Sequence, residues 1–119
     1  MAVLFLEYPK CSTCKKAKKW LDEHGVEYTD RHIAEDNPTA DELRAWLHAS
    51  GLPLRRFFNT SGMLYRELGV KEKLDAGMGE DEALELLASN GILVKRPLLV
   101  TDGAIIPGFK EDAWAAALL

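Results

Sequence analysis

The sequence predicts an α/β fold in which a β-α-β unit precedes a helical middle and a β-β-α end. A short apolar run opens the chain at residues 2–6, as a buried strand does. Apolar residues at helical spacing fill much of residues 39–91, the predicted helical insert. Two further apolar runs meet at the tight-turn signal Asp102-Gly103. We therefore expect a small mixed four-stranded sheet in a single domain over residues 1–119, a length that fits one domain.

The β-α-β unit occupies about the first thirty residues. Residues 2–6 (AVLFL) are expected to form its first strand, and residues 26–31 (VEYTDR) alternate apolar and polar like a second strand. Gly25 stands where a helix C-cap glycine belongs. Between the strands, four side chains recur at i, i+3, i+4 and i+7 and predict an amphipathic helix: Ala17, Trp20, Leu21 and His24.

The middle of the chain is predicted to be helical. Thr39 or Asp41 caps a first helix, which stops before Gly51. Three shorter helices follow: one after the turn at residues 59–62 that ends at Leu68, one over residues 71–75, and one over residues 80–89.

The end of the chain returns to β structure. Residues 97–101 (PLLVT) and 104–106 are expected to pair as a hairpin around the Asp102-Gly103 turn. Apolar side chains at helical spacing in residues 110–119 predict a closing helix.

The composition narrows the classes of function. The net charge of −4 and a pI near 5.4 argue against direct nucleic-acid binding, which usually needs a basic face. No segment has the features of a signal peptide or a membrane-spanning helix, so no membrane partner is expected. We therefore expect a cytoplasmic protein, in a compartment where thiols stay reduced and structural disulfides are rare.

Both cysteines of the chain lie in one motif, Cys11-x-x-Cys14. Three readings compete: half a zinc site, a structural disulfide or a redox pair. A structural zinc site usually has four ligands, but this chain has a single Cys-x-x-Cys motif to supply two of them. Its histidines cannot complete a zinc-finger pattern, because His24, His32 and His48 lie eight and sixteen residues apart. A structural disulfide is disfavoured by the expected compartment. The motif therefore favours a redox-active Cys11/Cys14 disulfide pair and no metal.

The two thiols are expected to differ. Cys11 occupies a helix start, where free N–H groups and the helix dipole favour a thiolate and lower its pKa. Cys14 is in phase with Ala17 and Leu21, so it is expected to point toward the core. These positions predict that Cys11 is the nucleophile and that Cys14 resolves the mixed disulfide, with Lys15 the lysine nearest to the thiols.

Several segments, in their order, resemble the arsenate reductase/Spx family of thioredoxin-fold proteins. They are CSTC after the first strand (residues 11–14), FNTSGMLYRELG (58–69), VKRPLLVTDG (94–103) and VTDGAIIPGFKEDAW (100–114). The resemblance covers nearly the whole chain and implies a thioredoxin-like fold.

The resemblance also implies roles for single residues. Arg96 matches an arginine that binds oxyanion substrates or steadies the thiolate, and its planar guanidinium suits that task. Pro97 matches a cis proline beside the nucleophilic cysteine. Substrate-binding positions are therefore expected at Pro97, Asn59 and Lys15.

Arsenate reductases proper use one essential cysteine and three arginines, and this chain departs from both features. Asn59 stands where a second arginine is expected, and residues 108–110 supply no third. Arg55 and Arg56 are close in sequence to the missing position and are candidate substitutes. Arsenate is therefore expected to bind weakly.

Two functions follow from the resemblance. The first is a thiol-dependent, arsenate reductase-like oxidoreductase without a bound cofactor, which receives electrons from glutathione, glutaredoxin or thioredoxin and reduces a disulfide substrate. The alternative is an Spx-like redox sensor that regulates transcription by binding the C-terminal domain of the RNA polymerase α subunit.

Overall fold

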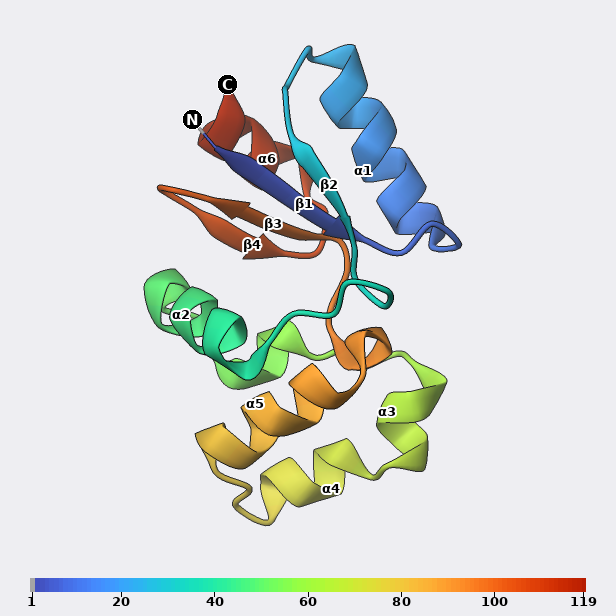
Figure 1. Cartoon of the computed structure of the whole chain (residues 1–119), viewed down its shortest axis with the longest axis vertical. Coiled ribbons are helices and arrows are strands. Elements are labelled where there is room, and N and C mark those ends of the chain that lie inside the picture. The colour runs from blue at the N-terminus through green and yellow to red at the C-terminus, as the bar shows by residue number, and fades with distance from the viewer. Residues whose placement is uncertain (1) are drawn as a thin grey trace.

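The structure is a computed structural model that describes residues 2–119, with the sheet and its two flanking helices at one end and the helices of the middle region at the other (Figure 1). In chain order the elements are β1 (Val3–Glu7), α1 (Ser12–Glu23), β2 (Thr29–His32), α2 (Ala40–Ser50), a 3₁₀ helix (Leu54–Phe57), α3 (Met63–Glu67), α4 (Val70–Asp75), α5 (Glu80–Ser89), a second 3₁₀ helix (Gly91–Leu93), β3 (Leu98–Thr101), β4 (Ile105–Pro107) and α6 (Glu111–Leu118).

The four strands form one sheet in the order β2-β1-β3-β4. Strand β1 pairs parallel with β2, as a β-α-β crossover requires, and antiparallel with β3. Strands β3 and β4 form the antiparallel hairpin, with Leu99 opposite Ile106. The predicted mixed sheet of four strands is therefore confirmed.

Each face of the sheet has its own apolar core, because side chains alternate along a strand. Phe5 and Leu99 face α1 and α6, where they join a cluster that includes Trp20 and Trp114. Leu6 and Leu98 face the other way, into a larger cluster with the helices α2 to α5; this cluster also includes Leu43, Phe57, Phe58, Leu84 and Leu87. The helical middle thus covers one face of the sheet, and α1 and α6 cover the other (Figure 1).

The prediction for the second strand is wrong at its start. Strand β2 begins at Thr29, because residues 24 and 25 make the turn that leaves α1 and residues 26–28 are irregular. The N–H of Val26 donates a 3.0 Å bond to Leu21 O, and Gly25 adopts φ +66°. Tyr28 then packs edge-on against Phe5, which explains the alternating pattern without strand pairing.

The hairpin is also shifted from the predicted range. Thr101 uses both its backbone and its hydroxyl to close the turn: its N–H donates to Ala104 O at 2.8 Å, and its Oγ1 accepts from the N–H of Ala104 at 2.9 Å. Ala104 therefore belongs to the turn, and β4 runs from Ile105 to Pro107.

The helices of the middle region begin and end close to their predicted positions. Thr39 caps α2 in a capping box with Glu42, and Gly51 ends it with φ +66°. Helix α5 covers the predicted residues 80–89. Every helix within residues 2–119 is too short or too polar to cross a bilayer.

Candidate functional site

The Cys-x-x-Cys motif lies where β1 passes into α1. A turn closes this connection, in which the N–H of Cys11 donates to the Tyr8 carbonyl at 2.9 Å. Cys11 is then the N-cap of α1, with extended backbone angles (φ −90°, ψ 122°). The helix begins at Ser12 and places Cys14 in its first turn. The predicted position of Cys11 at a helix start is confirmed.

The two thiols differ in exposure. Cys11 is half-buried, whereas Cys14 is 0% exposed and belongs to the buried face of α1 with Ala17 and Leu21. Both are free cysteines in this structure. A reagent therefore has direct access to one sulfur of the pair.

The surroundings also shift the two pKa values in opposite directions. Burial by itself would raise the pKa of Cys11, but the N–H and thiol of Cys14, the N–H of Thr13 and the charge of Arg96 together lower it. The Cys11 side chain accepts no capping hydrogen bond, so we attribute the backbone contribution to nearby N–H dipoles that attract the thiolate. Burial, followed by the proximity of Cys11, raises the pKa of Cys14 to about 12. Of the two thiols, Cys11 is therefore the one that ionises at lower pH.

Arg96 is held beside this motif by contacts to two segments. Its Nη1 donates a 2.8 Å hydrogen bond to the carbonyl of Ile92. Its guanidinium carbon lies 5.1 Å from the centroid of the Tyr8 ring, a cation–π contact with the residue where β1 leaves the sheet. The buried Nε of Arg96 has no hydrogen-bond partner among the described residues. This fixed placement accounts for the effect of Arg96 on both thiols.

The next residue, Pro97, is buried and follows a cis peptide bond, as the resemblance implies. Its carbonyl accepts a 2.8 Å bond from the N–H of Gly108, which ties the end of the hairpin to the segment that carries Arg96.

A short backbone bridge joins the helical middle to this segment. The N–H of Asn59 donates to Leu93 O, and the N–H of Lys95 donates to Phe57 O, both at 2.8 Å. Phe58 and Val94 face each other between these bonds as an antiparallel pair. The residues just before Asn59 are therefore held next to those just before Arg96.

A basic pocket of about 290 Å³ opens where these segments meet the motif. Its cations are Arg56, Lys95, Arg96 and Lys110, and Thr13 lines it from between the two cysteines. We call this cavity the basic pocket. The sequence reasoning missed Lys95 and Thr13, although both lie next to residues that it singled out.

None of the three predicted substrate-binding residues lines the basic pocket: Pro97 follows the pocket residue Arg96, and Lys15 and Asn59 lie elsewhere. Lys15 borders a different, open hollow on α1 with Lys18 and Lys19. Asn59 takes part in the backbone bridge, and its Oδ1 accepts a 3.4 Å bond from Ser61. Of the two candidate substitutes for the missing arginine, Arg56 lines the pocket, whereas Arg55 forms an ion pair with Asp75.

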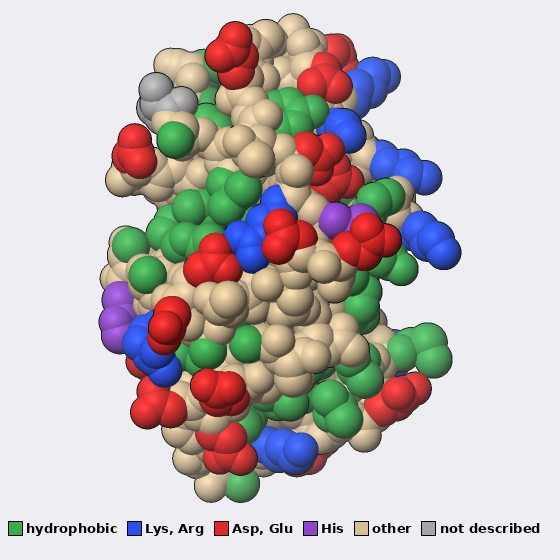
Figure 2. Space-filling model, in the orientation of Figure 1, with side chains coloured by type: hydrophobic (Ala, Val, Ile, Leu, Met, Phe, Trp, Pro, Cys, Tyr) green, Lys and Arg blue, Asp and Glu red, His purple; other side chains and the backbone are tan. Residues whose placement is uncertain are grey.

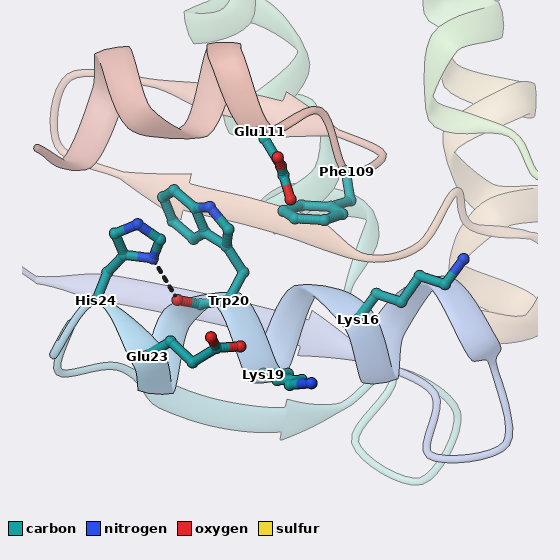
Figure 3. A pocket seen from close by; sticks show the side chains of 7 residues that line it. All are labelled: Lys16, Lys19, Trp20, Glu23, His24, Phe109 and Glu111. Carbon is teal, nitrogen blue, oxygen red and sulfur yellow. Dashed lines mark hydrogen bonds between the residues drawn. The ribbon is translucent and has the colours of Figure 1, made fainter.

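A larger hollow lies elsewhere, between α1 and the start of α6 (Figure 3). Its volume is about 510 Å³, and Trp20, His24 and Phe109 line it together with two lysines and two glutamates. Trp20 and His24 stack with centroids 4.2 Å apart, and His24 Nδ1 donates to the Trp20 carbonyl at 2.8 Å. No residue of the Cys-x-x-Cys motif lines this hollow, whereas Thr13 of the motif lines the basic pocket together with Arg96, so the basic pocket is the better candidate for the site.

Charge is unevenly spread over the surface. Lys and Arg side chains gather along the edge of the molecule over α1, and acidic side chains are interspersed over the region of α2 and α5 (Figure 2). Within residues 2–119, His, Cys, Asp and Glu side chains form no group of three or more suited to a metal ion.

Comparison with known proteins agrees with this architecture. A sequence model of the ArsC family matches residues 6–117. The uncharacterized protein YusI of Bacillus subtilis (strain 168) is 59% identical over 112 residues, which cover 94% of each chain. The global transcriptional regulator Spx of Staphylococcus epidermidis is 30% identical over 112 residues, which cover 94% of this chain and 82% of the regulator.

The solved structures extend the agreement to three dimensions. The crystal structure of an ArsC family related protein from Bacteroides fragilis has a TM-score of 0.92 and 56% identity, over 98% of this chain and 97% of that chain. The predicted thioredoxin-like fold class is thereby confirmed. The chain belongs to the ArsC family, the arsenate reductase/Spx family that its motifs resemble.

Proposed function

We propose that the chain is a cytoplasmic thiol–disulfide oxidoreductase in which Cys11 is the nucleophile and Cys14 is the resolving cysteine. The observation that carries the proposal is the asymmetry of the pair. Cys11 is half-buried with a lowered pKa, and Cys14 is fully buried with a pKa raised to about 12. An accessible thiolate followed by a protected thiol suits sequential thiol–disulfide exchange.

In the first step the Cys11 thiolate attacks one sulfur of the substrate disulfide. A mixed disulfide forms with Cys11, and the other half of the substrate leaves as a thiolate, which takes a proton from solvent. Arg96 stabilises the attacking thiolate because its guanidinium is held next to the motif by Ile92 and Tyr8.

The first step prepares the second. The hydrogen bond to Cys11 and its charge are two of the causes that raise the pKa of Cys14. When Cys11 enters a mixed disulfide that charge is gone, so the Cys14 proton is lost to solvent more readily. The Cys14 thiolate then attacks Cys11 Sγ, releases the second half of the substrate, and leaves a Cys11–Cys14 disulfide. The substrate has gained two electrons, and the protein has lost two.

An external thiol must return the protein to the dithiol state. Glutathione, glutaredoxin or thioredoxin is the proposed reductant, and no bound cofactor is required. Single-turnover oxidation by bis(2-hydroxyethyl) disulfide, a neutral probe, tests the proposal by mass spectrometry. Wild-type protein should lose two hydrogens, Cys14→Ser should stop at a mixed disulfide, and Cys11→Ser should not react. Equal reaction of the Cys11→Ser protein would contradict the assigned roles.

A second candidate is an Spx-like redox sensor that binds the C-terminal domain of the RNA polymerase α subunit. The similarity to the regulator Spx over 94% of this chain favours it, because the same thiol pair would then act as a switch. The test is a pull-down of purified α subunit by the oxidised and the reduced protein in parallel. Binding that depends on the redox state supports the sensor, and turnover without binding supports the reductase.

A further inference from the structure

The basic pocket gathers cations that lack acidic partners. Within residues 2–119, no carboxylate lies at ion-pair distance from its four cationic side chains: Arg56, Lys95, Arg96 and Lys110. By contrast, Arg31 is paired with Glu42, and Arg55 with Asp75. Since the whole chain carries a net charge of −4, this concentration of unpaired positive charge is local.

The fold, and not the order of the residues in the chain, brings these cations together. The backbone bridge between Phe57 and Lys95 sets Arg56 beside Lys95 and Arg96. Lys110 arrives from the other side, as the N-cap residue of α6. Lys95 is held close to this end of the hairpin, because a Cβ on Gly108 would lie 3.3 Å from its Cε.

Like charges that line one pocket repel one another, and an anion in the pocket would relieve that repulsion. The pocket lies next to the proposed chemistry, because its lining includes Thr13, which stands between the two cysteines. Its volume of about 290 Å³ suits a small acidic group. With about 30 Å³ for each water in the liquid, it corresponds to about ten waters.

We propose that the basic pocket selects substrates by charge, binding the carboxylate arm of a small anionic disulfide while one of its sulfurs lies at Cys11. The inference rests on the proposed thiol–disulfide function and names its substrate class. Arg56, Lys95 and Lys110 attract the carboxylate. Arg96 lines the pocket and lies beside the Cys-x-x-Cys motif, so its charge attracts both the carboxylate and the Cys11 thiolate. The exchange itself follows the two steps above: two substrate thiols form, and the protein becomes the Cys11–Cys14 disulfide.

Three disulfides of similar size and different charge test the proposal: 3,3′-dithiodipropionate (anionic), bis(2-hydroxyethyl) disulfide (neutral) and cystamine (cationic). The readout is the rate of single-turnover oxidation of the reduced protein, followed by mass spectrometry. Each rate is divided by the rate of the same disulfide with 2-mercaptoethanol, which removes intrinsic reactivity. At low salt we expect the anionic probe to be favoured over the cationic probe by on the order of tenfold. This preference should shrink in 0.5 M NaCl, where the Debye length falls to about 4 Å.

Variants show whether the preference comes from the pocket. Arg56→Gln and Lys110→Gln should each lower the ratio of the anionic to the neutral rate by about two- to fivefold. Lys19→Gln is the matched control: it removes one positive charge from an exposed position on α1 that does not line the basic pocket. Its ratio should stay at the wild-type value.

The outcomes separate this inference from the function on which it rests. Oxidation by all three probes at equal normalised rates overturns charge selection and leaves the thiol–disulfide function standing. An equal loss of preference in Lys19→Gln and Arg56→Gln also overturns it, because net charge and not the pocket would then explain the effect. If no probe oxidises the protein, the proposed function fails and the inference fails with it.

Discussion

The backbone N–H of Lys95 donates a 2.8 Å hydrogen bond to the carbonyl of Phe57. This bond joins residues nearly forty positions apart and connects the helical middle to the segment that carries Arg96. Phe58 faces Val94 beside it, and both side chains are buried in the larger core. The helical middle therefore contributes to the site as well as covering one face of the sheet.

Phe58→Ala is expected to destabilise the protein strongly. Phe58 is 1% exposed and packs against Tyr65 with ring centroids 5.9 Å apart, so its loss leaves a cavity in the core. Truncation of a buried phenylalanine lowers the free energy of unfolding by about 3–5 kcal/mol. Urea unfolding measures the change, and Met63→Ala is the control because Met63 is 71% exposed. Equal losses in the two variants would contradict the role of Phe58 in the core.

Cys11 is expected to be the more acidic thiol. The structure lowers its pKa and raises that of Cys14 to about 12, so at pH 6 to 7 Cys11 should carry the larger fraction of thiolate. Iodoacetamide alkylation of Cys14→Ser should therefore be faster than alkylation of Cys11→Ser across this range. The same variants in urea serve as controls, because unfolding should bring the two rates together. Faster native alkylation of Cys11→Ser would reverse the assignment.

Mild oxidation is expected to give an intramolecular disulfide. Cys11 and Cys14 lie in one helical turn and influence each other's pKa, so closure needs little movement. After limited peroxide treatment, mass spectrometry should show a monomer lighter by two hydrogens. Treatment of Cys14→Ser should yield covalent dimer or sulfenic acid instead. A wild-type product that is mainly covalent dimer would rule out the resolving role of Cys14.

Features set by local sequence could be predicted, and those set by distant contacts could not. Helix α5 matched its predicted range because its apolar spacing lies within the segment itself, and Cys11 was placed at the start of α1 in the same way. Strand β2 was predicted too early because the pattern at residues 26–28 arises from packing against Phe5.

The basic pocket depends on contacts across the chain. Arg56, Lys95 and Lys110 meet only through the backbone bridge and the hairpin, and no local pattern marks those pairings. The sequence did hold one indication of the pocket, because a basic residue lies close to each of two predicted site residues: Arg56 is near Asn59, and Lys95 is beside Arg96. The roles assigned to these residues stay predictions.

Glu7 is expected to make stability fall as pH rises. The carboxyl group is 6% exposed, and burial, followed by Asp30, raises its pKa to about 7, although Lys18 at 3.5 Å opposes the shift. Glu7, Lys18 and Asp30 line a small hollow together with His32. A folded-state pKa above the ordinary value of 4.5 means that the folded protein binds more protons between these values. This contribution to stability is complete below about pH 4.5 and is lost as pH rises through 7.

Glu7→Gln should remove that pH dependence. Between pH 5 and 8 the variant should gain about 1–3 kcal/mol in the free energy of unfolding relative to wild type, measured with urea. The pKa of Asp30 is lowered, so Asp30 titrates below this range. The control is Glu27→Gln, since Glu27 is exposed. Parallel pH profiles for wild type and Glu7→Gln would refute the prediction.

Arsenate is expected to be a poor substrate. The charge of Arg96 contributes to lowering the pKa of Cys11, and Asn59 stands where a second arginine is expected. Each charge-assisted contact to an anion contributes roughly 1.5–3 kcal/mol, so the lack of two weakens binding by about two to four powers of ten. Arg56 and Lys110 line the adjacent basic pocket, but neither cysteine does. The measurement is steady-state arsenate reduction with glutathione plus glutaredoxin, and separately with thioredoxin, against Cys11→Ser as the control. Saturation at micromolar arsenate that Cys11→Ser abolishes would show that one guanidinium and the neighbouring cations suffice, and the chain would then be an arsenate reductase in the full sense.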